Sequence, residues 1–143
     1  MKKIVFVVLI SLFLGFSTSP KKFKLSIKVE GISEVKGNLG ILLFNSEDGY
    51  PETSTKALKS YTVKVESESM TIELGEFVKG EYAVTLMQDK NMNGRMDKNM
   101  IGIPKEPFGF TKLESIPFGT PSFDETRIVL VKSTVERIKM MEI

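Results

Sequence analysis

Residues 23–30 read Phe-Lys-Leu-Ser-Ile-Lys-Val-Glu, and apolar and polar side chains alternate at every position of this stretch. Successive side chains of a β-strand point to opposite faces, so a strict period of two places all four apolar side chains on one face. The charged and hydroxyl side chains then lie on the other face. The stretch therefore predicts a strand with one buried face and one solvent-exposed face.

Similar patterns recur along the rest of the chain. Six further stretches alternate in the same way or form short apolar runs between turn-forming residues. They are residues 39–44, 61–65, 70–74, 82–87, 128–131 and 135–140. The only helical pattern covers residues 55–60, about one turn of helix. Several short strands separated by turns are typical of a β-sandwich, and a chain of 143 residues is long enough for one such domain.

The composition excludes several classes of chemistry. The chain contains no Cys, His or Trp. Without cysteine it has no disulfide framework, no thiol nucleophile and no lipid-acylated cysteine. Without histidine it lacks the usual general base near neutral pH and the commonest transition-metal ligand. Catalysis or metal binding must therefore use carboxylates, lysines, hydroxyls, amides and backbone groups.

The N-terminus has the pattern of a secretory signal peptide. Lys2 and Lys3 precede an apolar run at residues 4–16, and small or hydroxyl residues follow. We expect residues 1–17 to be the signal peptide and residues 18–143 to form a single domain, exported to the periplasm or the extracellular space. Cleavage after Ser19 and an uncleaved anchor are the alternatives. The apolar run is shorter than the ~20 residues of a membrane-spanning helix, so we expect no membrane span after cleavage.

Charge disfavours two kinds of partner. Removal of Lys2 and Lys3 leaves 18 basic and 18 acidic side chains in the predicted domain. A neutral domain lacks the basic footprint of a nucleic-acid-binding protein and the polybasic patch that attracts an anionic membrane. We therefore expect no nucleic-acid partner.

Residues 89–97 read Asp-Lys-Asn-Met-Asn-Gly-Arg-Met-Asp and match the first nine positions of an EF-hand calcium loop. Oxygen atoms at alternate positions converge on one side of a curled backbone, and glycine at the sixth position permits the sharp turn. Met96 fits the hydrophobic position that anchors the loop. The predicted calcium ligands are the side chains of Asp89, Asn91, Asn93 and Asp97 and the backbone carbonyl of Arg95.

The twelfth position departs from the EF-hand pattern, because Met100 stands where a bidentate glutamate is expected and no helices flank the loop. Asp97 could bind through both oxygens, or Glu106 could fold back to complete the ligand set. With so few carboxylates we expect weak calcium binding, with a Kd of ~10⁻⁴–10⁻³ M. One alternative is a plain Asn-Gly turn that binds no ion.

A copper site is a second alternative to calcium at this loop. Met92, Met96 and Met100 recur every four residues, and thioethers suit Cu(I). Side chains at this spacing share a face only on a helix, and the turn-forming pair Asn93-Gly94 argues against a helix here. We therefore favour calcium over copper.

Residues 104–123 form a long connection rich in Pro, Phe and Gly. A connection of about 20 residues is unusual in a compact domain unless it is functional or well packed. Its phenylalanines are Phe108, Phe110, Phe118 and Phe123. We expect them to plug the open end of the sandwich, because apolar side chains of small domains usually pack inside. A recognition patch is the alternative.

Three motifs, in this order, resemble an uncharacterised bacterial family. They are Asp89-x-Asn91-x-Asn93-Gly94-x-x-Asp97, then Gly102-Ile103-Pro104-x-Glu106-x-x-Gly109-Phe110, then Pro121-Ser122-Phe123. Over residues 23–140 the chain is similar to the family catalogued as domain of unknown function 2141. The resemblance implies a secreted or periplasmic β-sandwich with no assigned activity. It also implies a histidine just before the first loop aspartate; this chain has Gln88 there, which puts any role of that histidine in doubt.

A second, weaker resemblance concerns the fold. The lead-in Gly80-Glu81-Tyr82 resembles transthyretin-like and collagen-adhesin B-type repeats, in which a strand ends at a calcium-type loop. The expected fold is therefore all-β: a single antiparallel β-sandwich of about seven strands, immunoglobulin-like or transthyretin-like, with one long Pro/Phe/Gly-rich loop.

These features favour an exported binding or structural module with a weak calcium loop, and calcium would then position Phe108 and Phe110. The expected partner is an unidentified cell-envelope protein or a polysaccharide. A carboxylate-based extracellular hydrolase is the alternative, because Asp89, Asp97 and Glu106 are clustered and a glycosidase needs two carboxyl groups ~5–9.5 Å apart. Metal ligation explains Asp89 and Asp97 more economically, so we expect no enzymatic activity. A β-sandwich with no metal site is the second alternative.

Overall fold

The computed structural model describes residues 18–143, and the predicted signal peptide at residues 1–17 lies outside the described residues. The strands are β1 (Lys22–Glu30), β2 (Asn38–Phe44), β3 (Lys59–Lys64), β4 (Ser69–Val78), β5 (Gly80–Asp89), β6 (Phe108–Phe110), β7 (Ile128–Leu130) and β8 (Thr134–Lys139). Two short helices, the 3₁₀ turn η1 (Ser54–Lys56) and α1 (Phe123–Thr126), complete the elements. No helix in the described part of the chain is both long enough and apolar enough to cross a membrane.

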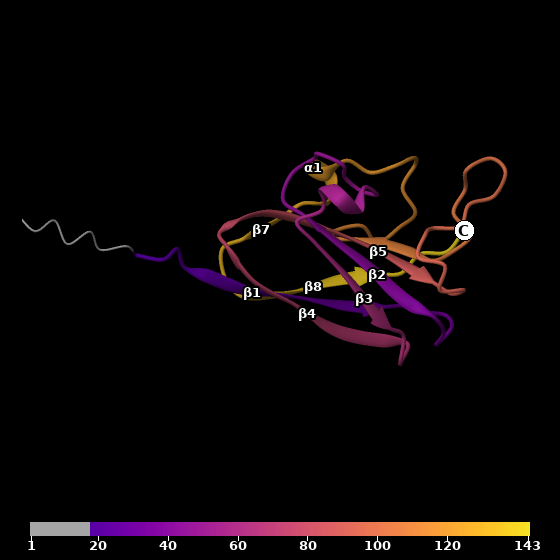
Figure 1. Ribbon diagram of the computed structural model, residues 1–143, viewed down its shortest axis with the longest axis horizontal. Helices are drawn as coiled ribbons and strands as arrows, with labels where there is room; N and C mark the ends of the chain where they lie inside the picture. Colours follow the sequence, from indigo (N-terminus) through magenta and orange to yellow (C-terminus); the bar gives the residue numbers. More distant parts are fainter. Residues whose placement is uncertain (1–17) are drawn as a thin grey trace, which may run out of the picture.

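The strands form two sheets. One contains β4, β1 and β8 in that order, and the other contains β3, β2, β5 and β6, with β7 paired to the first residues of β5. Figure 1 shows the two sheets as layers, with α1 above the larger one. The predicted all-β sandwich is confirmed.

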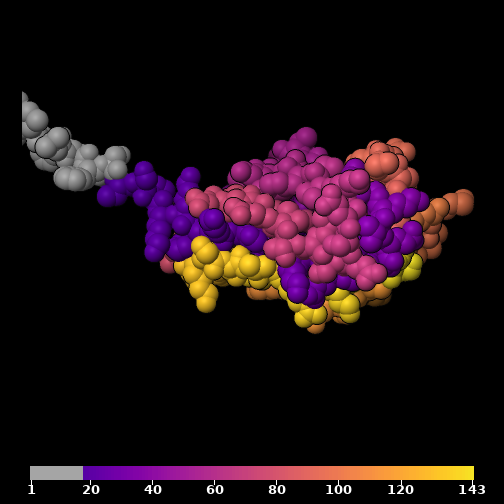
Figure 2. All heavy atoms as spheres, turned by 90° about the horizontal axis from the view of Figure 1, so that it is seen from below, coloured from indigo at the N-terminus to yellow at the C-terminus, as the bar shows by residue number. Residues whose placement is uncertain are grey.

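One pairing departs from the predicted antiparallel arrangement. Strand β8 runs parallel to β1, with Leu25 opposite Thr134 and Glu30 opposite Lys139. Figure 2 shows the yellow C-terminal residues lying along the indigo residues of β1. Parallel strands need a long crossover between them. Here β1 and β8 lie near opposite ends of the described chain, so the rest of the sandwich provides that crossover.

The alternation of β1 has the predicted result. Leu25, Ile27 and Val29 are fully buried between the sheets, whereas Lys24 and Lys28 lie on the outer face. The register with β4 shifts between Leu25 and Ser26, opposite Gly75, which has a φ of 121°. Glycine accepts such a φ without steric cost. The bulge therefore lets β4 bend while β1 keeps its apolar face inward.

The predicted Pro/Phe/Gly-rich loop contains regular structure that the sequence analysis did not predict. Strand β6 extends the larger sheet beside β5. Helix α1 begins at a capping box, in which the Ser122 hydroxyl accepts from the backbone N–H of Glu125 and the Glu125 carboxylate accepts from that of Ser122. This Ser-x-x-Glu pattern is a sequence signature of a helix N-terminus and could have predicted α1. The helical pattern at residues 55–60, in contrast, becomes η1 followed by the start of β3.

A second hydrophobic cluster lies outside the main core. It contains Phe44, Ala83 and Phe123, and Tyr50 packs against it. The rings of Phe44 and Phe123 both contact Tyr50 edge-on, with centroids 5.3 and 5.8 Å from that of Tyr50. The loop after β2 and helix α1 are therefore held on the outer face of the larger sheet.

Candidate ion-binding loop and its polar support

The candidate loop begins where β5 ends. Asp89 is the last residue of that strand, and the loop projects at the end of the sandwich near the C-terminus (Figure 1). Gly94 has a φ of 79°, and Met92 has a φ of 58°. These left-handed residues curl the backbone, as the motif at residues 89–97 requires.

Side-chain oxygens of the loop hold its backbone. The two carboxylate oxygens of Asp89 accept hydrogen bonds from the backbone N–H groups of Asn93 (3.1 Å) and Gly94 (2.6 Å). The amide oxygen of Asn91 accepts from Asn93 N–H at 3.1 Å, and that of Asn93 accepts from Arg95 N–H at 3.0 Å. Asp and Asn side chains stabilise tight turns in this way.

Asp97 lies opposite these residues. Its two carboxylate oxygens accept hydrogen bonds from the amide nitrogens of Asn91 (2.6 Å) and Asn93 (2.9 Å). These two hydrogen bonds, Asn93 first, lower the pKa of Asp97 below its ordinary value of 3.8. The structure therefore brings together the side chains of Asp89, Asn91, Asn93 and Asp97, four of the predicted ligands.

Glu106 lies at the base of the loop. It is only 5% exposed, and its carboxylate accepts hydrogen bonds from the backbone N–H groups of Lys90 (2.9 Å) and Asp97 (3.1 Å). These donors flank the loop on its two sides. Glu106 thus clamps the loop closed through the backbone, and both of its oxygens are engaged in doing so.

A turn at Asn99 returns the chain so that Glu106 can reach the loop. The amide oxygen of Asn99 accepts hydrogen bonds from the backbone N–H groups of Ile101 (3.0 Å) and Ile103 (2.9 Å). Lys98 and Pro104 form an isolated antiparallel β-bridge across the turn. The Gly-Ile-Pro-x-Glu stretch therefore positions the carboxylate of Glu106 beneath residues 90–97.

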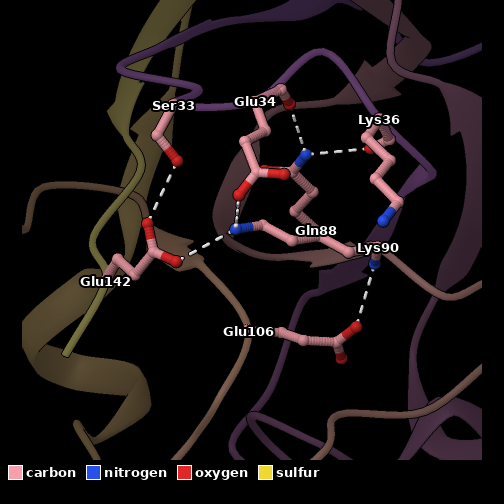
Figure 3. A network of polar contacts seen from close by, with 7 residues as sticks. All are labelled: Ser33, Glu34, Lys36, Gln88, Lys90, Glu106 and Glu142. Carbon is pink, nitrogen blue, oxygen red and sulfur yellow. Dashed lines mark hydrogen bonds and ion pairs between the residues drawn. The ribbon is translucent and has the colours of Figure 1, made fainter.

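Sequence reasoning missed a second polar group beside the loop, shown in Figure 3. The ammonium group of Lys90 contacts the carboxylates of Glu34 and Glu142, each at 3.0 Å, and Ser33 donates to the other oxygen of Glu142. Burial alone would lower the pKa of Lys90, but the hydrogen bonds that its ammonium group donates to Glu142 and Glu34 outweigh this effect and raise the pKa. These ion pairs join the start of the candidate loop at Lys90 to residues 33–36 and to the C-terminal segment at Glu142.

Gln88 supports the same region from inside the sandwich. It is fully buried, and its amide nitrogen donates to the carbonyls of Glu34 (2.7 Å) and Lys36 (2.9 Å). Its amide oxygen is the only buried side-chain oxygen or nitrogen without a partner within the described residues. The sequence could have predicted that Gln88 is buried, because Gln88 continues the inward-facing alternation of Tyr82, Val84 and Leu86.

Residues 27–139 match the family described as "Uncharacterized protein conserved in bacteria (DUF2141)". The chain belongs to this family. Neither a curated protein nor a solved structure matches it. The matched region of this DUF2141 domain includes the loop, Glu106 and Gln88.

The side chains of the DUF2141 loop carry carboxylate and amide groups, and the amide nitrogens of Asn91 and Asn93 face Asp97. Within residues 18–143, no group of three or more His, Cys, Asp or Glu side chains lies close enough to hold a metal ion. The loop instead combines the carboxylates of Asp89 and Asp97 with amide oxygens, which suit a hard cation such as calcium rather than zinc. Residues 92–100 form no helix, so the three methionines do not share a helical face as a copper site would need.

The DUF2141 domain separates its four candidate phenylalanines. Phe123 is 8% exposed in the second cluster, whereas Phe118 is fully exposed at 110%. Phe108 and Phe110 pair with Met87 and Thr85 across β5 and β6, which places them on the outer face of the larger sheet. They therefore do not lie between the two sheets, although Phe108 is as buried as Phe123, at 8% exposed.

Proposed function

We propose that this DUF2141 domain is an exported, non-enzymatic binding or structural module whose loop at residues 89–97 binds calcium weakly. The observation that carries the proposal is the convergence of two carboxylates and two amides from alternate positions of one curled loop. A turn that only reverses the chain needs fewer of these groups. The proposed partner is a cell-envelope protein or a polysaccharide.

The proposed ligands are Asp89, Asn91, Asn93 and Asp97, together with the carbonyl of Arg95. Calcium would supply a positive charge that organises these oxygens and rigidifies the loop. Asp97 accepts two amide hydrogen bonds that calcium ligation would replace, so the surroundings of Asp97 would change on binding. Glu106 is proposed as the clamp that keeps the loop curled, because both of its oxygens accept backbone hydrogen bonds.

The same contacts argue against the hydrolase alternative. A general acid or nucleophile needs a carboxylate that can reach a substrate. Asp89 and Glu106 are each only 5% exposed, and both oxygens of Glu106 are already bonded to backbone N–H groups that flank the loop. We therefore propose a binding role rather than a catalytic one.

Thermal unfolding in EDTA and in calcium tests the proposal. A ligand that binds only the folded state at about tenfold over its Kd stabilises the protein by ~1.4 kcal/mol. For a domain of this size, we expect calcium at about 10 mM to raise Tm by ~3–6 °C. Magnesium should raise it less, because magnesium keeps its water shell more tightly.

The informative variant is Asp97→Asn, which keeps the shape of the side chain and removes its charge. We expect it to lose the calcium-dependent rise in Tm. Asp48→Asn is the matched control, because Asp48 is an exposed aspartate on another loop, paired with Lys56. If wild-type protein melts at the same temperature in EDTA and in calcium, the loop is only a turn and the proposal fails.

A further inference from the structure

A groove of about 800 Å³ lies on the outer face of the larger sheet, the face that carries Phe108 and Phe110. Its floor includes Gly40 and Leu42 of β2 and Met87 of β5. Its walls come from three connections: residues 51–54 before and within η1, residues 94–104 in the second half of the candidate ion loop and the turn after it, and residues 116–121 before α1. Small-molecule sites in proteins have volumes of roughly 300–1,000 Å³.

The groove is lined mainly by apolar side chains. They include Met96, Ile103, Pro104, Phe108, Phe110 and Pro117. The apolar surface continues beyond the groove, because Ile101 at its edge is 79% exposed and Phe118 is fully exposed. Contiguous apolar surface of this kind on a small domain marks an interaction site.

Three charged side chains line the groove, and two of them neutralise each other. The ammonium group of Lys98 pairs with the carboxylate of Glu52 at 3.2 Å, joining two of the walls. The third is Arg95, whose side chain makes no ion pair with any carboxylate in the part of the chain that the structure describes. Its positive charge acts on Asp97 without an ion pair, and the Asp97 carboxylate already accepts two amide hydrogen bonds. Among the charged side chains that line the groove, Arg95 is therefore the one that forms no ion pair within residues 18–143.

We propose that this groove binds a free single-chain carboxylate amphiphile, with the acyl chain on the apolar floor and the carboxylate at Arg95. The apolar lining provides the favourable burial for a hydrocarbon chain. The guanidinium of Arg95, which has no ion-pair partner within the described residues, provides a charge-assisted contact for one anionic head. The site shares Arg95 with the candidate ion loop but uses its guanidinium, whereas the proposed calcium ligand is the backbone carbonyl of the same residue.

Isothermal titration with decanoate, below its micelle concentration, tests the proposal. We expect saturable binding of one molecule per chain. Arg95→Gln should weaken decanoate binding about tenfold and leave binding of the neutral analogue decanol unchanged, because only the carboxylate uses the guanidinium. Lys24→Gln on β1, in the other sheet, is the matched control and should bind decanoate as the wild type does.

A second variant fills the groove without touching its charge. Gly40 lies on its floor, and a Cβ there would meet the flexible end of Met87 at 3.1 Å. Gly40→Leu should therefore remove binding of both decanoate and decanol, while circular dichroism shows the wild-type fold. If this variant does not fold, the comparison of decanoate and decanol binding by Arg95→Gln still tests the proposal.

Three results would overturn the proposal. The first is the absence of saturable decanoate binding, with or without calcium. The second is decanoate binding that Arg95→Gln leaves at wild-type strength. The third is sedimentation with phosphatidylglycerol vesicles, or binding of a soluble oligosaccharide, by a protein that does not bind monomeric decanoate. Failure of calcium binding leaves the amphiphile proposal standing, and the calcium experiment is likewise independent of decanoate.

Discussion

Glu106 shows how one carboxylate shapes a loop through backbone groups nine and sixteen residues away in sequence. It is buried, and it faces two backbone N–H groups that would otherwise lack partners inside the protein. A carboxylate has only acceptors and can satisfy both donors at once. The shape of the candidate ion loop therefore depends on a residue outside the loop motif.

Replacing Glu106 by Gln should destabilise the protein whether or not calcium is present. The amide of Gln presents only one oxygen, so one of the two backbone N–H groups would face an NH₂ group and lose its acceptor. We expect a loss of ~1–3 kcal/mol in the free energy of unfolding, the cost of a buried unsatisfied polar group. Urea unfolding in EDTA measures it, and an unchanged midpoint would refute the clamp.

The carboxylate of Asp97 should make the stability of the protein depend on pH. Its pKa in the folded protein is lowered by hydrogen bonds from Asn93 and Asn91. A lowered pKa contributes stability that is present above the ordinary value near 3.8 and is lost as the pH falls through the lower folded value. The Tm difference between wild type and Asp97→Asn should therefore be largest near neutral pH and shrink in acid. A difference that stays constant down to the acid transition would contradict this cause.

Strand β5 organises the larger sheet. It pairs with β2 along one edge and with β7 and then β6 along the other, and its last residue begins the candidate ion loop. Gly109 of β6 lies opposite Leu86, and a Cβ there would come within 2.8 Å of Ile138 and 3.0 Å of the Lys139 carbonyl. Glycine is thus needed for β6 to lie this close to the end of β8.

Two phenylalanines of the Pro/Phe/Gly segment should contribute differently to the stability of the protein when each is replaced by alanine. Phe123 is buried against Phe44 and Tyr50, so Phe123→Ala should lower the free energy of unfolding by ~3–5 kcal/mol. Phe118 is fully exposed, so Phe118→Ala should change it by less than ~0.5 kcal/mol. Denaturant midpoints measure both. Equal losses in the two variants would show that the exposed loop packs differently in solution.

Lys90 joins segments from both ends of the domain. Its contacts with Glu34 and Glu142 bring the turn after β1 and the residues after β8 to the entry of the candidate ion loop (Figure 3). The parallel pairing of β1 and β8 brings these two segments to the same end of the sandwich. A closed sandwich of this kind folds as one unit, so we expect a single cooperative unfolding transition.

Export is a prediction for the whole protein that the described residues do not address. The charged start and the apolar run at residues 4–16 predict removal of a signal peptide. Mass spectrometry of the protein purified from its native cells should show a new N-terminus near Thr18. Recovery of a chain that still begins at Met1 from the cytoplasmic fraction would contradict this prediction.

The sequence alone determined the strand content and the place of the candidate loop. An alternation of apolar and polar residues is present in any strand that buries one face. Strand β1 and the inward residues of β5 could therefore be predicted from the sequence without knowing their partner strands. The Asx and glycine pattern at residues 89–97 was readable because each of its hydrogen bonds joins residues at most six apart.

Only the tertiary structure decided the partners of these elements. The parallel course of β8, the pairing of the three-residue β6, and the contacts of Glu106, Lys90 and Gln88 all join residues far apart in sequence. No local period encodes such contacts, because they depend on which faces meet after the two sheets have packed. The same physical reason applies to the groove, which forms where three separate connections surround one face of the larger sheet.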